Sequence, residues 1–320
     1  MVTLNQIFAN GVILQANKPI RFFGEGNGTV EITLFGNTKT TNSNGKWLIE
    51  FDKRDYQNES FDILFKLDGE EYKISAYLGD VYLLCGQSNM QFKLWESSEP
   101  AENYIDNENM RLYTVDRIES GEHFMSKDGW VKCTKENAPH FSAIGYYIGQ
   151  ALSREHKIGL ISMYQGASAI QSWMPKYVAS KYPVSKAFLE YPIWNDSAVL
   201  FEHMTKTILP FSISHVLWYQ GESNSFVGEA ELYSKMLYDM INSWRSEFCD
   251  SNLPFVVIQI ADCDWRNDEP WRAIQREQLK IVDMINNVWV VRSNDVCESD
   301  DIHPKTKSVL CKRIVDAILS

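Results

Sequence analysis

Several features that assign a chain to a broad class are absent from this sequence. No run of about 18 apolar residues occurs, so we expect no helix that crosses a membrane. Lysine and arginine number 31 against 42 aspartates and glutamates, which gives a net charge of −11 without a basic cluster. A nucleic-acid partner is therefore not expected. Neither C-x-x-C nor H-E-x-x-H is present, and the sequence calls for no metal or other cofactor.

The N-terminal segment and the cysteines bear on cellular location. The segment "MVTLNQIFANGVILQ" lacks the charged start and the apolar block of a secretory signal. The six cysteines are scattered without a short pairing, so we expect them to be reduced. Both observations predict a cytoplasmic protein, and the sequence leaves the oligomeric state open.

The hydrophobic pattern changes near residue 78. Between residues 19 and 78, short runs such as "VEITLFG" and "FDILFKL" alternate apolar and polar residues. Turn-like segments, "GEGNGT" at 24–29 and "NTKTTNSNGK" at 37–46, separate such runs. This pattern is typical of antiparallel strands. We therefore predict a small β-sandwich-like domain over residues 1–78 and a second domain over residues 79–320.

In the second part, apolar runs alternate with amphipathic helical patterns. The runs lie near residues 81–85, 158–163, 214–219, 254–260 and 288–293. The helical patterns cover residues 142–156, 196–208, 229–248, 273–287 and 305–319. This alternation predicts a three-layer α/β/α fold, in which helices cover both faces of a five-stranded parallel sheet. Residues 91–140 fit neither period, and we expect loops and short helices there, over the edge of the sheet.

Polar residues and glycines follow several of these strands. Ligands of an open parallel sheet bind beyond the carboxyl ends of its strands, so we expect the segments after the strands to meet at one edge. These segments are "GQSN" at 86–89, "YQGAS" at 164–168, "YQGESN" at 219–224 and "SDDIHP" at 299–304. Together they supply a serine, glycine NH groups, side-chain amides and a carboxylate near a histidine. Those are the parts of a serine acyl-transfer site.

The chemistry of acyl transfer gives each residue type a role. The hydroxyl of Ser88 needs a base to become a nucleophile, and His303 is the candidate. The second imidazole nitrogen needs an acceptor, which Asp300 can provide from the same loop. During attack the ester carbonyl oxygen becomes an anion that requires hydrogen-bond donors. The candidate donors are the NH of Ser88, the NH of Gly166 and the side-chain amide of Asn224.

Each of these residues also has an ordinary structural explanation. Ser88 can cap a helix, "SDDIHP" can open one, and Asn224 can stabilise a turn. Their joint placement after different strands favours the catalytic interpretation. Position 90 is methionine, so the G-x-S-x-G elbow of the α/β-hydrolases is absent and the serine must be presented in another way.

Four blocks, in order, extend this pattern to a known family. The blocks "GDVYLLCGQSNM", "GLISMYQGASAIQSW", "LWYQGESN" and "DDIHP" resemble the sialate O-acetylesterase-like branch of the SGNH hydrolases. The segment "FANGVILQANKPIRFFGEG" is similar to the β domain that often precedes the catalytic domain in that branch. The resemblance implies a flavodoxin-like SGNH domain with Ser88 as the nucleophile and His303 as the base. It also implies that Gly166 and Asn224 are oxyanion donors.

The resemblance leaves the group behind His303 open between Asp300, Asp301 and a backbone carbonyl. It implies that the substrate is a small acetylated carbohydrate, such as an O-acetylated sialic acid, from which the acetyl group is removed. Hydrolysis of acetylated xylan, of other short acyl esters or of thioesters is an alternative. A further alternative, from another class, is a protein that binds carbohydrate without catalysis.

Substrate contacts are expected from side chains on the same strand-end segments. An aromatic ring can stack on a sugar, and a carboxylate on the sugar favours an arginine. We expect contacts from Gln87, Gln220, Glu222 and Trp173. Trp95 and Trp265 are further stacking candidates, and Arg266 is the candidate for binding a sialic acid carboxylate.

Overall fold

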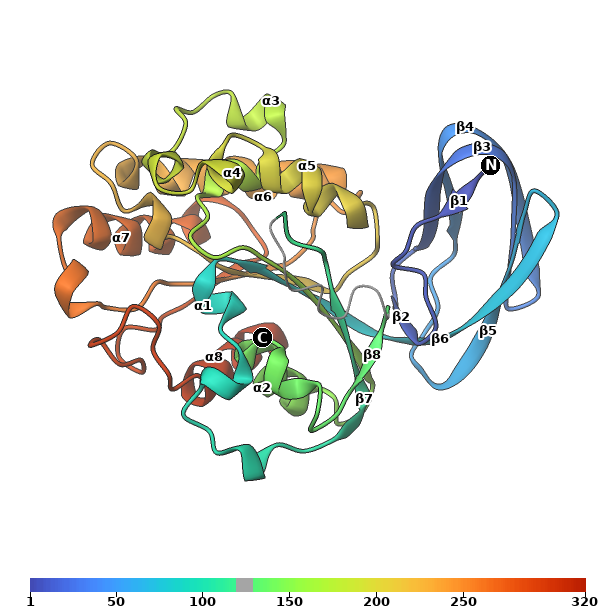
Figure 1. The fold of residues 1–320 in the computed structure, drawn as a ribbon, viewed down its shortest axis with the longest axis horizontal. Coiled ribbons are helices and arrows are strands. Elements are labelled where there is room, and N and C mark those ends of the chain that lie inside the picture. Colours follow the sequence, from blue (N-terminus) through green and yellow to red (C-terminus); the bar gives the residue numbers. More distant parts are fainter. Residues whose placement is uncertain (119–128) are drawn as a thin grey trace.

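Two parts lie side by side in the computed structural model, which describes residues 1–118 and 129–320 (Figure 1). The first part consists of strands, and in the second part helices cover both faces of a sheet. The strands of the first part are β1 (Thr3–Leu4), β2 (Val12–Gln15), β3 (Ile20–Leu34), β4 (Asn37–Phe51), β5 (Gln57–Leu67) and the first half of β6 (Glu70–Gly86).

The β part is built from two long hairpins. Strand β3 pairs with β4 along its whole length, and β5 pairs with both β3 and β6, in every case antiparallel. The turns predicted at residues 24–29 and 37–46 are wrong, because both segments lie inside strands. A Cβ at Gly24 would lie 2.0 Å from the carbonyl oxygen of Thr3. Glycine is therefore needed in β3 to let β1 approach closely, and not to form a turn.

Strand β6 continues into the second part without a break. Its residues 79–86 pair in parallel with β9 (Lys157–Tyr164) on one side, and its residues 82–86 pair in parallel with β10 (His215–Tyr219) on the other. The larger sheet has the order β7-β9-β6-β10-β11-β12, and the remaining bounds are β7 (Asn107–Thr114), β8 (Val131–Cys133), β11 (Phe255–Ile258) and β12 (Val288–Val291). Strands β7 and β9 lie on one side of β6, and β10, β11 and β12 follow on the other side. The order in which the chain adds strands therefore reverses at β6, and ligands of such sheets bind at the carboxyl end of that position.

The five predicted parallel strands are all present, but their number was too low. Strand β7 is a sixth parallel strand beside β9, and β8 pairs with β7 antiparallel, so the sheet is mixed. Both strands lie in residues 91–140, where we predicted loops and short helices; residues 119–128 of that stretch lie outside the described residues. In "NENMRLYT" only residues 110–113 are buried and the first three residues are polar, so the pattern of β7 did not indicate a strand.

Helices cover both faces of this sheet (Figure 1). Residues of α2 and α8 belong to the apolar cluster on one face, and residues of α6 and α7 belong to the cluster on the other. Each of the five predicted helical segments contains a helix, although α5 is short. The helices are α1 (Ser88–Gln91), α2 (Ala143–Leu152), α3 (Lys176–Ala179), α4 (Pro192–Asn195), α5 (Val199–His203), α6 (Tyr233–Glu247), α7 (Glu269–Met284) and α8 (Ser308–Leu319). Among the described residues, none of the helices is long and apolar enough to span a bilayer.

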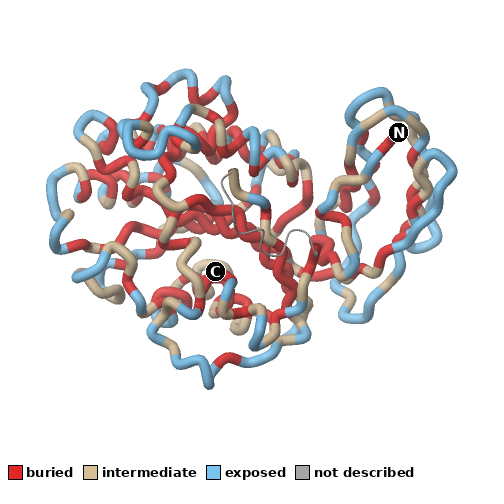
Figure 2. The backbone as a smooth tube through the Cα atoms, viewed as in Figure 1, coloured by how far each residue is buried: buried red, intermediate tan, exposed pale blue. Residues whose placement is uncertain are grey.

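The β part and the α/β part share an apolar core. The central strands form the most deeply buried layer, and buried residues continue from them into the β part (Figure 2). The rings of Phe8 and Phe211 lie 5.7 Å apart across the junction, and the indole NH of Trp130 donates to the carbonyl oxygen of Ile7. The predicted domain boundary at residue 78 thus falls within β6, in a region where the two parts are packed together.

Replacement of Gly86 by alanine tests how closely β6 and β10 approach each other at the end of β6. Gly86 has φ +130°, and a Cβ there would lie 2.0 Å from the carbonyl oxygen of Tyr219. Gly45 has a similar φ of +123° but open space around it. We expect Gly45→Ala to cost about 1 kcal/mol of unfolding free energy, because of backbone strain alone. Gly86→Ala should cost about 3 kcal/mol or more, because strain and overpacking add.

Denaturant unfolding of both variants measures this difference. Equal losses of stability in the two variants would contradict the close approach of β6 and β10.

Candidate functional site

Backbone hydrogen bonds join the segments that follow three neighbouring strands. The NH of Gln87, just after β6, donates to the carbonyl oxygen of Tyr219 in β10 at 3.0 Å. The NH of Gln165, just after β9, donates to the carbonyl oxygen of Gly86 at 3.0 Å. The loops that carry Ser88, Gly166 and residues 220–224 therefore leave the sheet from fixed positions.

A cavity of about 500 Å³ lies at this edge of the sheet. Ser88, Gly166 and His303 all line it, although they come from widely separated parts of the sequence. Helix α1 begins at Ser88, directly beyond the end of β6. A Cβ placed on Gly166 would lie 3.8 Å from the Cβ of Ser88, so the two residues are direct neighbours. The structure thus brings the predicted nucleophile, one predicted donor and the predicted base to one cavity.

The side chain of Gln91 accepts a hydrogen bond from the backbone NH of Gly166, the group that we predicted to stabilise the oxyanion. The NH of Gly166 donates to Oε1 of Gln91 at 2.9 Å, and Gln91 lines the same cavity. A substrate oxygen must take the place of this amide oxygen before Gly166 can donate to it. Gln91 was missed at the sequence level. The available signal was its position three residues after Ser88, which puts both side chains on one face of a short helix.

Asn224 is not placed as an oxyanion donor. Its side chain is completely buried and does not line the cavity. Its Nδ2 donates to Oε1 of Gln171 at 2.8 Å and to Oε2 of Glu229 at 3.2 Å, while its Oδ1 accepts from the NH of Ile170. Both donor positions of the amide are therefore already used inside the protein. The residue braces two loops beneath the cavity, which corrects the role that we predicted for it.

Two of the four residues predicted to contact substrate are also buried, and their side chains form hydrogen bonds inside the protein. Gln220 is fully buried, and its Nε2 donates to the carbonyl oxygen of Ser168 at 2.9 Å. Trp173 is fully buried as well, and its indole NH donates to Oγ of Ser168 at 3.0 Å. Neither side chain lines the cavity. A substrate contact from Gln220 or Trp173 is therefore excluded by their burial.

The other two residues, Gln87 and Glu222, do line the cavity. Oε1 of Gln87 accepts from the NH groups of Gly221 and Ser223, while its Nε2 makes no hydrogen bond within the described part of the chain. Oε1 of Glu222 accepts from Nδ2 of Asn89 at 2.7 Å, whereas its buried Oε2 has no partner among the described residues. Burial raises the pKa of Glu222. Gln87 keeps an amide nitrogen unpaired at the cavity, whereas the unpaired oxygen of Glu222 is buried, and a contact of either side chain with substrate stays a prediction.

The surroundings of His303 favour a neutral imidazole. Burial lowers its pKa, the positive charge of Lys307 lowers it further, and the carboxylates of Asp301 and Glu96 oppose this shift. A pKa below the usual value of about 6.5 leaves the ring neutral at pH 7, as a general base requires. No hydrogen bond of the His303 ring or of the Ser88 hydroxyl occurs among the described residues. Such bonds commonly form only when substrate is bound.

The two aspartates before His303 differ in their relation to it. Oδ1 of Asp301 accepts from the backbone NH of His303 at 2.9 Å, and its charge acts on the ring. Asp300 is exposed, and its carboxylate makes no hydrogen bond within residues 1–118 and 129–320. Among the described residues the Asp300 carboxylate makes no contact with the imidazole, and of the two aspartates it is Asp301 whose charge acts on the ring.

Aromatic residues form one rim of the cavity. Tyr191 and Trp194 both line it, and their rings are stacked with centroids 5.5 Å apart. Tyr191 is 41% exposed, so a face of this pair is open to a ligand. From the sequence we expected Trp95 and Trp265 instead, which are exposed but do not line the cavity. We predicted no helix or strand between residues 164 and 195, and nothing in "EYPIWN" showed on which side its rings would lie.

Arg266 lies on the same cavity, as its proposed role requires. Its Nη2 donates to Oγ of Ser225 at 2.7 Å, and its guanidinium lies 5.5 Å from the ring centroid of Trp271. These contacts fix the side chain at the cavity wall. A planar cation held in this way can bind a carboxylate through two hydrogen bonds.

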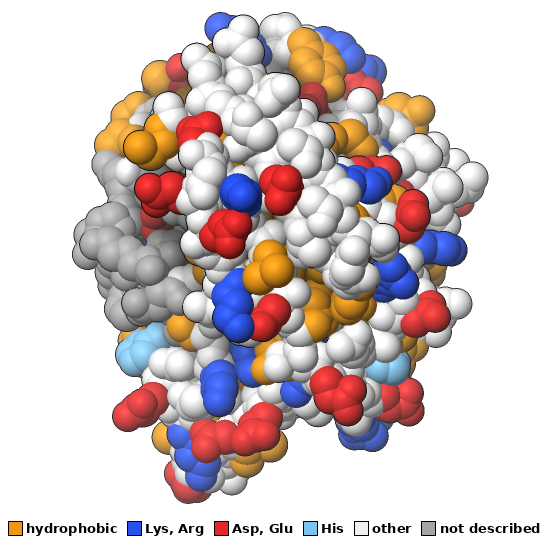
Figure 3. Space-filling model, turned by 90° about the vertical axis from the view of Figure 1, so that its right-hand side faces the viewer, with side chains coloured by type: hydrophobic (Ala, Val, Ile, Leu, Met, Phe, Trp, Pro, Cys, Tyr) orange, Lys and Arg blue, Asp and Glu red, His pale blue; other side chains and the backbone are white. Residues whose placement is uncertain are grey.

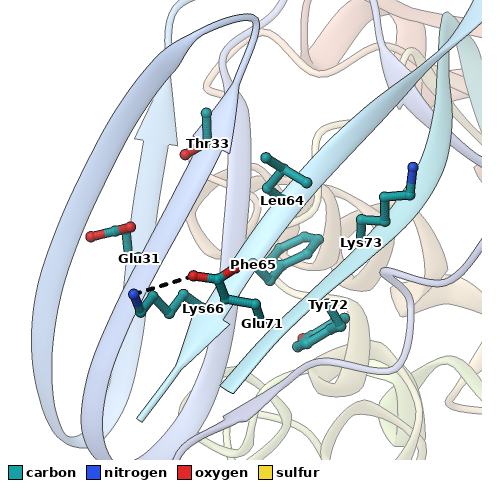
Figure 4. A pocket seen from close by; sticks show the side chains of 8 residues that line it. All are labelled: Glu31, Thr33, Leu64, Phe65, Lys66, Glu71, Tyr72 and Lys73. Carbon is teal, nitrogen blue, oxygen red and sulfur yellow. Dashed lines mark ion pairs between the residues drawn. The ribbon is translucent and has the colours of Figure 1, made fainter. Parts of the chain in front are cut away.

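A second cavity, of about 290 Å³, lies on the strands of the β part (Figure 4). Lys66 and Glu71 form an ion pair of 3.2 Å beside it, and Tyr72 stacks on the buried ring of Phe65. Figure 3, which views the molecule from this end, shows acidic and basic side chains interspersed over the described surface. The residues that line this cavity include no serine, cysteine or histidine, so it offers no serine–histidine or cysteine–histidine pair for acyl transfer.

Comparison with known proteins shows which family has this arrangement. A family model described as carbohydrate esterase, sialic acid-specific acetylesterase, matches residues 78–320. The chain belongs to this family of carbohydrate esterases. The resemblance predicted from four sequence blocks is therefore confirmed.

Curated relatives of this esterase family member carry a consistent name. The sialate O-acetylesterase of Homo sapiens is 25% identical over 272 residues, which cover 74% of this chain and 52% of the human protein. That of Mus musculus is 23% identical over 298 residues, covering 74% of this chain and 55% of the mouse protein. The chain thus spans about half the length of the curated relatives that it matches.

Solved structures agree with the fold of this esterase family member. A carbohydrate acetylesterase from Xanthomonas citri superposes with a TM-score of 0.85 at 26% identity, over 99% of this chain and 74% of that one. A protein from Arabidopsis thaliana has a TM-score of 0.51 at 20% identity, over 75% of this chain and 98% of that one. The second likeness concerns the fold alone.

The two aspartates provide a matched test of the group that acts on His303 in this esterase family member. Asp301→Asn removes a negative charge that favours the imidazolium, so the pKa of His303 should fall. The acid limb of kcat/KM should then move to lower pH, and kcat should decrease. Asp300→Asn should leave both quantities unchanged, because that carboxylate is solvated.

Profiles of kcat/KM against pH for the two variants provide this measurement. A larger loss of kcat in Asp300→Asn than in Asp301→Asn would reverse the assignment.

Proposed function

We propose that the protein is a serine esterase of the SGNH type that removes O-acetyl groups from a carbohydrate through an acetyl-enzyme intermediate. The observation that carries this proposal is the meeting of Ser88, Gly166 and His303 at one cavity. That cavity lies at the carboxyl end of β6, where the strand order reverses. Membership in the carbohydrate esterase family gives independent support.

The first half of the reaction follows from the chemistry of these groups. His303 takes the proton of the Ser88 hydroxyl, and Oγ attacks the acetyl carbonyl carbon. The carbonyl oxygen becomes an oxyanion that accepts hydrogen bonds from the NH groups of Ser88 and Gly166. For this the hydrogen bond between Gly166 and Oε1 of Gln91 must first break. As the tetrahedral intermediate collapses, the bond to the sugar oxygen breaks. His303 returns its proton to that oxygen, and the acetyl group remains on Ser88.

The second half repeats these steps with water. A water molecule that donates its proton to His303 attacks the acetyl carbonyl carbon, and the same donors stabilise the new oxyanion. Collapse then releases acetate and returns the proton to Ser88. The lowered pKa of His303 suits both halves, because each begins with a neutral imidazole.

The cavity supports a sugar as the group that carries the acetyl ester. The stacked pair of Tyr191 and Trp194 provides an aromatic face on its rim. Gln87 lines the cavity and keeps its amide nitrogen available for a sugar hydroxyl, and Glu222 lines the cavity beside it. Arg266 adds a fixed positive charge, which favours a sugar that bears a carboxylate, as sialic acids do. We therefore propose an O-acetylated sialic acid or a related acidic sugar as the substrate.

Replacement of Ser88 tests the proposed reaction. Ser88→Ala should reduce hydrolysis of a chromogenic acetate ester by at least about 10³-fold, because the nucleophile is removed. Its melting temperature should be nearly unchanged, since Ser88 is only partly buried. Ser180→Ala, at an exposed serine that does not line the cavity, serves as the control and should keep full activity. Retention of activity in Ser88→Ala would refute the mechanism.

Replacement of Arg266 tests the proposed substrate class. Arg266→Met should lower kcat/KM for O-acetylated sialic acid about 10- to 100-fold, which corresponds to the loss of charge-assisted hydrogen bonds. Acetylated xylo-oligosaccharides lack the carboxylate, so their kcat/KM should change less than about twofold. Arg266→Lys keeps the charge and should fall between the wild type and Arg266→Met for the sialic acid.

Release of acetate from both substrates is the measurement. Equal losses of kcat/KM for the two substrates would show that Arg266 does not bind the carboxylate of the sugar. Activity on the neutral substrate alone would favour the acetylxylan esterase alternative.

A further inference from the structure

Asn89, the residue after the proposed nucleophile, connects three segments of the site. Its side chain is 1% exposed. Its Oδ1 accepts from Nζ of Lys307 at 2.8 Å. Its Nδ2 donates to Oε1 of Glu222 at 2.7 Å and to the carbonyl oxygen of Ile302 at 2.9 Å. One amide therefore joins helix α1, the loop after β10 and the loop that carries His303.

Lys307, which donates to the oxygen of this amide, is a lysine buried inside the protein. Its side chain is 1% exposed, and it lies at the start of α8. The ammonium lies 4.8 Å from the ring centroid of Phe92 and 5.7 Å from that of Tyr219. Among the described residues, no carboxylate oxygen lies within 4 Å of it. A buried cation is costly, so its retention here needs a reason beyond packing.

The amide of Asn89 supplies that reason by coupling two buried charges. The positive charge of Lys307 lies on one side of it and the carboxylate of Glu222 on the other. The hydrogen bond from Lys307 fixes which way the amide points. Only in that orientation can Nδ2 donate to Ile302, the residue before His303. The neighbour of Ser88 thus holds the neighbour of His303 through Nδ2 of its amide, while Lys307 holds the oxygen of the same amide.

We propose that Lys307 and Asn89 are positioning residues that set the distance between Ser88 and His303. This inference rests on the proposed esterase function and deepens it. Neither residue contacts substrate in this scheme. Their effect passes through the orientation of α1, through the loop at residues 299–304 and through the electric field at His303.

The charges around the two titrating groups determine the expected pH dependence. His303 faces the positive charge of Lys307 and the negative charges of Asp301 and Glu96. Lys307 in turn faces Glu222 and Glu298, together with the thiols of Cys297 and Cys311. Burial lowers the pKa of Lys307 to about 8, so the ammonium is mostly charged at neutral pH. Removal of this charge should raise the pKa of His303, and activity should then be lost at a higher pH during acidification.

Replacement of Lys307 by methionine tests the positioning role. We expect Lys307→Met to lower kcat for an acetate ester by at least about tenfold, because a small misplacement of catalytic groups is sufficient for such a loss. KM should stay within about threefold, since Lys307 does not line the cavity. The acid limb of kcat/KM should move to higher pH. Lys312→Met, at an exposed lysine of the same helix, is the control and should resemble the wild type.

A second variant separates positioning from folding. Lys307→Met alone leaves the carboxylate of Glu222 buried without its compensating charge and can lower the melting temperature. In the double variant Lys307→Met/Glu222→Gln both charges are absent, so stability should recover. The acid limb should nevertheless stay at the higher pH, because the charge that acts on His303 is still missing. Lys307→Arg keeps that charge and should restore the acid limb toward that of the wild type.

Active-site titration with a fluorophosphonate completes the test by counting functional sites. A merely structural role predicts fewer active sites, with kcat per active site and the acid limb unchanged, and that outcome would overturn the proposal. An unshifted acid limb in the double variant would overturn it too. If Ser88→Ala abolishes activity while the Lys307 variants behave as the wild type, only the positioning role fails. Retained activity in Ser88→Ala would instead refute the proposed function itself.

Discussion

The close contact between β6 and β10 at Gly86 is the constraint on which the site depends. No side chain fits between the α-carbon of Gly86 and the carbonyl oxygen of Tyr219, and the next NH donates to that same oxygen. The chain therefore leaves the sheet at a fixed point, and Ser88 follows two residues later as the first residue of α1. The bond from Gln165 to Gly86 places the neighbouring loop, with Gly166, against this point.

The sequence predicted those parts of the site that are set by sheet topology. Parallel strands end at one edge, so residues after different strands meet there wherever the strand pattern is clear. Ser88, Gly166 and His303 follow three such strands and line one cavity. The strands at 81–85, 158–163 and 288–293 were recognisable from their largely apolar runs, and for this reason their ends were recognisable too.

The parts that could not be predicted depend on tertiary packing. Asn224, Gln220 and Trp173 follow strands as the true cavity residues do, but neighbouring loops cover them completely. Burial of this kind leaves no mark in the local sequence. Strand β7 was missed because its first half is polar, and the glycines of β3 resembled a turn because the approach of β1 to them involves residues far away in sequence. The lysine that couples to Asn89 lies 218 positions away from it.

The aromatic and cationic groups proposed for sugar recognition lie outside the segments that carry the catalytic groups. Ser88 and Gly166 lie within two residues of the ends of β6 and β9, and His303 lies on the loop after β12. The groups proposed for sugar recognition, Tyr191, Trp194 and Arg266, lie in the connections after β9 and β11. Loops tolerate sequence change better than strand ends do, so one reaction can be kept while the sugar changes. The family model covers the part that holds both sets, from residue 78 onward.

Detection of the acetyl-enzyme intermediate is the most direct test of the central claim. The protein would be mixed with an activated acetate ester, quenched in acid within the first turnovers, digested and analysed by mass spectrometry. If Ser88 is the nucleophile, one acetyl group appears on the peptide that contains Ser88 and is absent from Ser88→Ala. An acetyl group on another residue, or hydrolysis by Ser88→Ala at the rate of the wild type, would contradict the mechanism.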